Sequence, residues 1–182
     1  MTTHNETDKA ARYTLLLRLM AGSVFFWEGL LKLVYVNQGV GRFTKLGFPF
    51  PELTAHFVAG FEIIGGLLIM VGLFTRLVAL GFVIEMVVAI LSTKISLFLG
   101  TSPLALPASP PKVGIWAVLH EIRSEWAQLT TSLFLLLAGP GPWSLDARRA
   151  GRIPAQRTRD QRASLSTSAA MKKATETSGA AL

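Results

Sequence analysis

The feature that most constrains this chain is a continuous apolar run at residues 53–74. As a helix, its 22 residues would be ~33 Å long, enough to cross the ~30 Å hydrocarbon core of a bilayer. One acid, Glu62, lies near the middle of the run. A carboxylate at that depth costs about 2.5–3.5 kcal/mol on insertion scales, so we expect Glu62 to face protein rather than lipid.

The same run carries small residues that would let a second helix approach closely. They are Ala59, Gly65, Gly66 and Gly72. Small side chains at a helix surface allow two backbones to pack tightly within a membrane. The run therefore predicts a membrane helix with a close neighbour and a polar interior.

The composition agrees with a membrane protein of one domain. Of the 182 residues, 51% are hydrophobic and 16% are charged, whereas soluble domains carry about 25% charged residues. Cysteine is absent. Disulfides, thiol redox chemistry, thiolate zinc sites and cysteine-ligated iron–sulfur clusters are therefore excluded.

The net charge of +7 is unevenly distributed along the chain. Eight of the 18 basic residues follow Leu145, and no aromatic residue follows Trp143. A nucleic-acid surface would need a folded basic face or aromatic platforms, so we predict no nucleic-acid partner. The basic tail instead indicates which side of the membrane the terminus occupies.

The hydropathy pattern predicts an all-α, four-helix transmembrane bundle. We expect a polar tail at 1–12, a transmembrane domain at 13–146, and a disordered basic tail at 147–182. The four spans are expected at about 13–36, 53–74, 77–97 and 115–138. Four crossings place both termini on one side, which the positive-inside rule identifies as the cytoplasm.

Two connections and the fourth span need separate treatment. Residues 37–52 are rich in Gly and Pro, and Phe43, Phe48 and Phe50 suggest a loop that lies at the interface or caps the bundle. Residues 98–112 contain four prolines, so they cannot form a continuous helix. For the fourth span we expect one helix at 115–138, and the alternative is an interfacial first half with a short re-entrant second half.

The first span has an unusual charged face. Arg18, Gly22, Phe25, Gly29 and Lys32 follow helical spacing and share that face. Glu28 lies beside it, one turn before Lys32, in the favoured order for an ion pair. One interpretation is a neutralised pair with Arg18 snorkelling to the interface; the other is a functional site within the membrane.

Each predicted span carries one acid near its middle. These acids are Glu28, Glu62, Glu85 and Glu125. In an antiparallel bundle they would form one layer close to Lys32, with Arg18 nearer the cytoplasmic face. Four carboxylates cannot all remain charged in a dry core beside one or two cations, so part of this layer should be protonated.

Several uses of such a layer are open. It could hold a quinone-like ligand, form a proton or ion path, or fix helix register through hydrogen bonds. A di-iron centre is disfavoured because the chain lacks the Glu-x-x-His motif of those bundles, and we predict no metal site. Haem ligation by His56 and His120 is a further, less favoured interpretation.

Several segments together resemble the DoxX family of small membrane proteins. The matching pieces are LLLRLMAGSVFFWEGLLKL, GRFTKLGFPFPELTAHFVAGFEIIGGLLIMVGLFTR, VIEMVVAI and the closing WAQLTTSLFLLLAGPGPWSLDARR, over about residues 13–149. The resemblance implies four helices in a bacterial-type plasma membrane and a link to quinone-dependent oxidoreductases. By position it places these residues at the family's recurring polar and glycine sites: Arg18, Gly29, Lys32, Glu62, Gly66, Arg76, Glu85 and Asp146.

The leading hypothesis is a membrane subunit of a quinone-linked oxidoreductase. The candidate catalytic residues are Glu62, Glu85, Glu28 and Lys32. The candidate ligand-binding residues are Arg18, Lys32, Glu62 and Glu125. One alternative is an anchor or assembly partner in the bilayer that recruits soluble redox enzymes through the basic tail; another is a small proton-coupled transporter.

Overall fold

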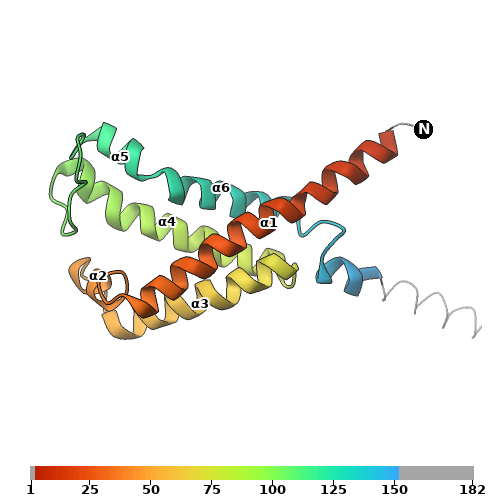
Figure 1. Ribbon diagram of the computed structural model, residues 1–182, viewed down its shortest axis with the longest axis horizontal. Coiled ribbons are helices and arrows are strands. Elements are labelled where there is room, and N and C mark those ends of the chain that lie inside the picture. The colour runs from red at the N-terminus through yellow and green to blue at the C-terminus, as the bar shows by residue number, and fades with distance from the viewer. Residues whose placement is uncertain (1–2, 152–182) are drawn as a thin grey trace, which may run out of the picture. The chain divides into compact units, whose positions relative to one another are not determined.

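A computed structural model describes residues 3–151, with side chains from Tyr13 onward, and its described part is all-helical (Figure 1). The helices belong to a compact unit that ends at Asp146, and residues from Ala147 belong to a second unit. The helices are α1 (Thr3–Val34), α2 (Val40–Lys45), α3 (Pro51–Val71), α4 (Thr75–Leu99), α5 (Ile115–Glu121) and α6 (Arg123–Ala138). Most of the predicted tail lies outside the described residues.

Three of these helices are long and apolar enough to cross a membrane. They are α1 from Tyr13 onward, α3 and α4. Their bounds differ from the predicted spans at the ends: α1 begins at Thr3, and α3 ends at Val71. The turn after α3 follows from Gly72, whose left-handed backbone (φ 70°) lets its amide bond the carbonyl of Ile69.

The prediction of one continuous helix at 115–138 is wrong, because the chain bends at Ile122 between α5 and α6. Side chains take up the carbonyl groups at this bend. Arg123 Nε donates to the carbonyl of His120 at 2.6 Å, and Lys94 Nζ donates to the carbonyl of Glu121 at 3.0 Å. With these partners the bend leaves fewer polar backbone groups unpaired.

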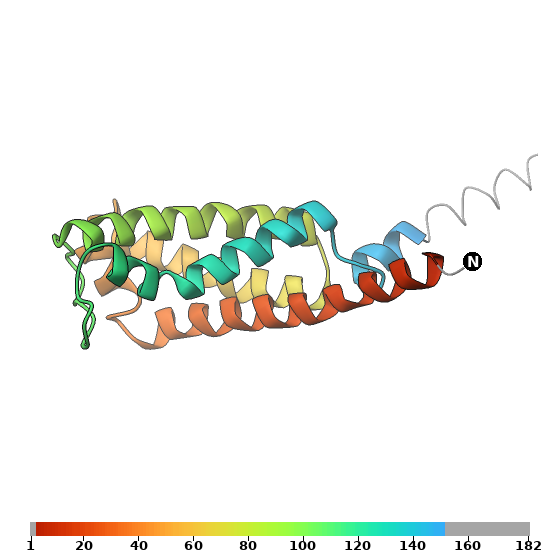
Figure 2. The ribbon, with the colours of Figure 1, turned by 90° about the horizontal axis from the view of Figure 1, so that it is seen from above.

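The helices pack as two pairs, α1 with α3 and α4 with α6 (Figures 1 and 2). Glycines set the contact between α1 and α3. A Cβ atom at Gly22 would lie 2.6 Å from the carbonyl oxygen of Gly66, and one at Gly29 would lie 2.7 Å from that of Ala59. The small-residue surface predicted for residues 53–74 is therefore confirmed for these positions, whereas Gly72 caps the helix.

Aromatic rings fill the space between the two pairs. The ring of Phe25 on α1 stacks parallel to that of Phe82 on α4, with centroids 3.6 Å apart. Phe61 on α3 contacts the same Phe82 ring at 4.9 Å. Ile69 and Leu135 extend this core, and both side chains are 1% exposed. The core separates the two ends of the unit.

One end of the unit is closed by a residue far along the chain. Asp146 accepts hydrogen bonds from the backbone amides of Phe74 and Thr75, each at 2.9 Å, and so caps the start of α4. Its own amide donates to the carbonyl of Gly72 at 2.9 Å. Arg18 is completely buried here and donates to the carbonyl of Trp143. Of the two interpretations of the charged face, the one in which Arg18 snorkels towards water does not fit this complete burial.

Candidate functional site

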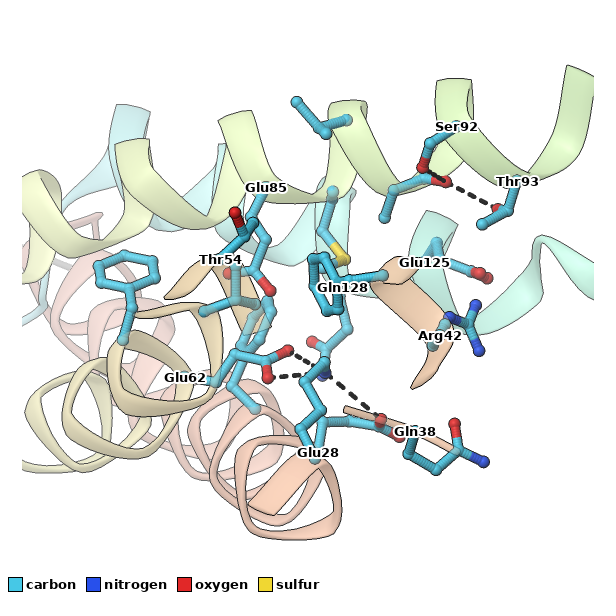
Figure 3. Close-up of a pocket in the computed structure, with 18 of the residues that line it drawn as sticks. Glu28, Gln38, Arg42, Thr54, Glu62, Glu85, Ser92, Thr93, Glu125 and Gln128 are labelled. Carbon is cyan, nitrogen blue, oxygen red and sulfur yellow. Dashed lines mark hydrogen bonds and ion pairs between the residues drawn. The ribbon is translucent and has the colours of Figure 1, made fainter. Parts of the chain in front are cut away.

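The opposite end of the unit, which carries α2 and α5, contains a cavity of about 710 Å³ (Figure 3). Its walls come from α1, α3, α4, α6 and the segment around α2. Five phenylalanines form much of the lining: Phe25, Phe43, Phe48, Phe57 and Phe61. The volume lies within the ~300–1,000 Å³ range of small-molecule sites, which are mostly apolar with a few placed polar groups.

The first polar group in the cavity is an ion pair between α1 and α3. Lys32 Nζ lies 2.8 Å from Oε1 and 2.6 Å from Oε2 of Glu62. The Glu62 side chain is 2% exposed, and that of Lys32 is 15% exposed. Glu28, the predicted partner of Lys32, is 3.9 Å away and 56% exposed. Lys32 therefore belongs mainly to Glu62, because the close α1–α3 contact brings the two together.

The second polar group is Glu85 on α4, which has no ion pair within the described residues. Its carboxyl group is near enough to Glu62 to interact with it electrostatically, and both side chains face the cavity in Figure 3. Glu85 Oε2 is buried without a hydrogen-bond partner in the part of the chain described. Gln128 Oε1 on α6 is buried without a partner in the same part of the chain.

A second ion pair joins α4 to α6. Lys94 Nζ lies 2.6 Å from Oε1 of Glu125, and the two side chains are 10% and 17% exposed. Glu125 lines the cavity, whereas Lys94 is not among its lining residues. The sequence pattern did not predict Lys94 as a site residue. A charge near the end of an apolar span could have marked Lys94 as a site residue. The spacing of residues along its own helix, however, does not indicate a partner on α6.

The segment 37–52, predicted as a loop that caps the bundle or lies at the interface, does line the cavity. It contains the short helix α2, which the sequence analysis missed. Phe43 and Phe48 pack edge to face with centroids 5.2 Å apart and contribute to the wall. Gln38 and Arg42 add polar groups to the same side (Figure 3).

The structure brings together all of the sequence-predicted site residues except one. Glu28, Lys32, Glu62, Glu85 and Glu125 all line the cavity. Arg18 does not: it precedes Lys32 by fourteen residues, ~21 Å along α1, and lies at the closed end. The cavity therefore holds four acids, one each from α1, α3, α4 and α6. They do not form the single layer that was predicted, because Glu125 pairs with Lys94, which lies nine residues from Glu85 on α4, ~14 Å along the helix axis.

Metal-ligating residues are not gathered at this site. Within residues 3–151 no group of three or more His, Asp or Glu side chains is placed to hold a metal ion. His56 is exposed and hydrogen-bonds the carbonyl of Glu52, and His120 pairs with Glu121. Neither histidine lines the large cavity.

Comparison with known proteins agrees with this architecture. The DoxX family matches residues 13–95. The uncharacterized membrane protein Rv3486 of Mycobacterium tuberculosis is 37% identical over 145 residues, which are 76% of this chain and 82% of the relative. This chain belongs to the DoxX family. Together with its candidate spans, the membership makes it a multi-pass membrane protein.

A second relative matches a shorter part of the chain. A Bacillus subtilis protein named "Putative oxidoreductase CatD" is 37% identical over 82 residues, which are 45% of this chain and 60% of that protein. No solved structure matches this DoxX-family chain. The chemistry of its cavity therefore has to be argued from the residues themselves.

Proposed function

We propose that this DoxX-family protein is the membrane subunit of a quinone-linked oxidoreductase and that its cavity binds a quinone-type lipid. The observation that carries the proposal is the pairing of an apolar, aromatic wall with ionisable side chains at the depth of the spans. A quinone ring and its isoprenoid chain are apolar, and the ring carbonyls need hydrogen-bond donors. The name of the Bacillus subtilis relative supports an oxidoreductase function, without naming a quinone.

Three side chains would have separate roles in binding and protonating the quinone. Lys32 has an ammonium group that can donate a hydrogen bond to a ring carbonyl, and Glu62 holds that group in place at 2.6–2.8 Å. Glu85 can hold a proton without leaving a cation unpaired, because both lysines near the cavity pair with other acids. Reduction of a quinone to a hydroquinone takes two electrons and two protons. In this proposal a redox partner supplies the electrons, and these side chains supply and position protons.

Arg18 is left out of the proposed ligand site because it lies at the closed end, where its guanidinium bonds Trp143. Glu125 stays within the site as a cavity-lining acid. Glu28 contributes a partly exposed carboxylate beside Lys32.

A direct experiment is to extract the full chain from membranes in mild detergent and quantify bound quinone by mass spectrometry. We expect quinone with the native protein and at least a tenfold loss in Glu62→Gln. The matched control is Glu52→Gln, an exposed glutamate at the start of α3 outside the cavity. No quinone in either sample, with a soluble enzyme captured by the native chain, would overturn the proposal in favour of an anchor.

A transporter would give a different result. Liposomes that contain only this protein should show no proton or solute flux beyond that of empty liposomes if the cavity serves quinone chemistry. Sustained flux that Glu62→Gln abolishes would favour a proton-coupled carrier instead.

We further propose that α5 and α6 together form a fourth crossing, which places both termini in the cytoplasm. The sixteen residues of α6 cover only ~24 Å, less than the ~30 Å hydrocarbon core, so α5 is needed to complete the span. The chain has no cysteine, so single cysteines can be labelled without background. Ser102→Cys should react with an impermeant maleimide from outside intact cells, and Ser168→Cys only after permeabilisation. The reverse pattern would invert the topology.

A further inference from the structure

At the bend between α5 and α6, a surface depression and the cavity share one lining residue, Ser124. A surface depression of about 480 Å³ is lined by His120, Glu121, Arg123 and Ser124. Ser124 also lines the large cavity. The residue that follows it, Glu125, lines the large cavity as well. Titratable groups at the surface and in the cavity are therefore adjacent at this bend.

The Lys94–Glu125 pair stands at this junction. Lys94 has a second hydrogen bond, to the carbonyl of Glu121 at 3.0 Å. If Glu125 took up a proton, Lys94 would keep that backbone bond. The cost of separating this ion pair is therefore smaller than for a lysine whose only partner is the carboxylate.

Polar groups continue inward from this pair. Gln128 is 6% exposed, lines the cavity, and has a buried Oε1 without a hydrogen-bond partner in the described part of the chain. Figure 3 shows Glu125, Gln128 and Glu85 following one another across the cavity. Glu85 and Lys94 are nine residues apart on α4, ~14 Å along the axis. Polar groups line the cavity between these two positions, and its volume of about 710 Å³ has room for water molecules that bridge them.

Glu85 is the cavity acid best placed to receive a proton. The charged groups that act on it are Glu62 on α3 and both Glu28 and Lys32 on α1. Protonation of Glu62 would leave Lys32 with only Glu28, at 3.9 Å. Protonation of Glu85 leaves no cation unpaired and removes one negative charge from the group of acids that line the cavity.

We propose that the α5–α6 bend is the route by which protons reach the cavity, with Glu125 as the uptake group and Glu85 as the acceptor. A proton from water in the surface depression binds the Glu125 carboxylate, which separates from Lys94. Glu125 then releases it to cavity water held by Gln128, and the Glu85 carboxylate takes it up. Glu125 is ionised again and returns to Lys94. The inference rests on the proposed function, because the proton at Glu85 would serve a bound quinone.

The test uses the full chain in lipid, without added quinone. Infrared spectroscopy follows hydrogen–deuterium exchange of the carboxyl stretching band that disappears in Glu85→Gln. We expect exchange at this band to slow at least tenfold in Glu125→Gln. The double variant Lys94→Gln/Glu125→Gln leaves neither charge unpaired and should be equally slow, which separates loss of the carrier from damage to the fold.

A matched variant tests the specificity of the route. Glu52→Gln changes an exposed acid outside the cavity and should exchange at the native rate. A native rate in Glu125→Gln, or equal slowing in Glu52→Gln, would overturn the proposal. So would the absence of any band that Glu85→Gln removes, since Glu85 would then hold no proton.

This experiment fails separately from the test of quinone binding. Bound quinone with unaltered exchange in Glu125→Gln would leave the proposed function intact and remove the route. Slowed exchange in a protein that retains no quinone would leave a proton path and remove the quinone site.

Discussion

Charged side chains serve different purposes at the two ends of the helical unit. At the closed end, Arg18 and Asp146 bond the main chain: Arg18 reaches the carbonyl of Trp143, and Asp146 takes the amides of Phe74 and Thr75. At the open end, Lys32, Glu62 and Glu85 lie on the wall of a cavity. Charges that bond backbone groups fix chain connections, whereas charges beside an accessible volume remain available to a ligand.

The largest expected effect breaks the ion pair at the open end. Glu62→Leu leaves Lys32 with only the distant Glu28 and should lower the free energy of unfolding by about 3–5 kcal/mol. Adding Lys32→Met removes the stranded charge and should restore stability to within about 1 kcal/mol of the native protein. Thermal and denaturant unfolding in detergent would measure both. If the double variant is as unstable as the single one, the Lys32–Glu62 pair stabilises the fold in the way that Asp146 does, and the difference between the two ends is lost.

At the closed end, Asp146→Ala should lower the free energy of unfolding by about 3 kcal/mol, since it removes the acceptor of two charge-assisted hydrogen bonds. Asp146→Asn keeps one side-chain acceptor and should lose about half as much. The same unfolding measurements apply. Quinone retained per folded molecule should equal that of the native protein, and a selective loss of quinone would contradict the division between the two ends.

The glycine contact between α1 and α3 links the two ends and should be sensitive to a single methyl group. Gly66→Ala places a Cβ atom 2.6 Å from the carbonyl oxygen of Gly22, so we expect a loss of about 1–3 kcal/mol. Gly60→Ala on the same helix meets nothing within 4 Å and should gain up to about 1 kcal/mol from helix propensity. Equal stabilities for the two variants would show that α1 and α3 are not in such close contact.

The smallest expected effect is at the mouth of the cavity. Arg42 on α2 is partly exposed, so Arg42→Gln should change the free energy of unfolding by no more than about 0.5 kcal/mol. Measuring the free energy of unfolding of Arg42→Gln and Asp146→Ala under the same conditions would compare the two ends directly. A decrease of more than about 1 kcal/mol in the free energy of unfolding would show that Arg42 stabilises the fold.

Much of the helical architecture could be predicted because hydropathy and helical spacing are local properties of the sequence. The apolar runs marked α1, α3 and α4, and the small residues marked α3 as a helix with a close neighbour, without identifying α1 as that neighbour. The short helix α2 and the bend at Ile122 could not be predicted in this way. The bend exists where Lys94 and Arg123 bond carbonyl groups, and one of these residues lies on another helix.

The candidate site was likewise predicted only in part. The sequence predicted an acid near the middle of each of four spans, and all four acids line one cavity. Glu125, however, lies in the first turn of α6 rather than in the middle of a helix. It assigned Lys32 the wrong main partner, because i,i+4 spacing favours Glu28 while the structure offers Glu62 at 2.6 Å. It also grouped Arg18 with the cavity, since a helical face was traced without knowing how far along the helix the cavity extends.

The sequence by itself determined that this protein is helical, belongs in a membrane and carries at least one acid in each of its apolar segments. Hydrophobicity and period along one helix suffice for those conclusions. Only the tertiary structure decided which cation neutralises which acid, and which charges close one end or face a cavity at the other. Those outcomes depend on the rotation and separation of different helices, which no local spacing records.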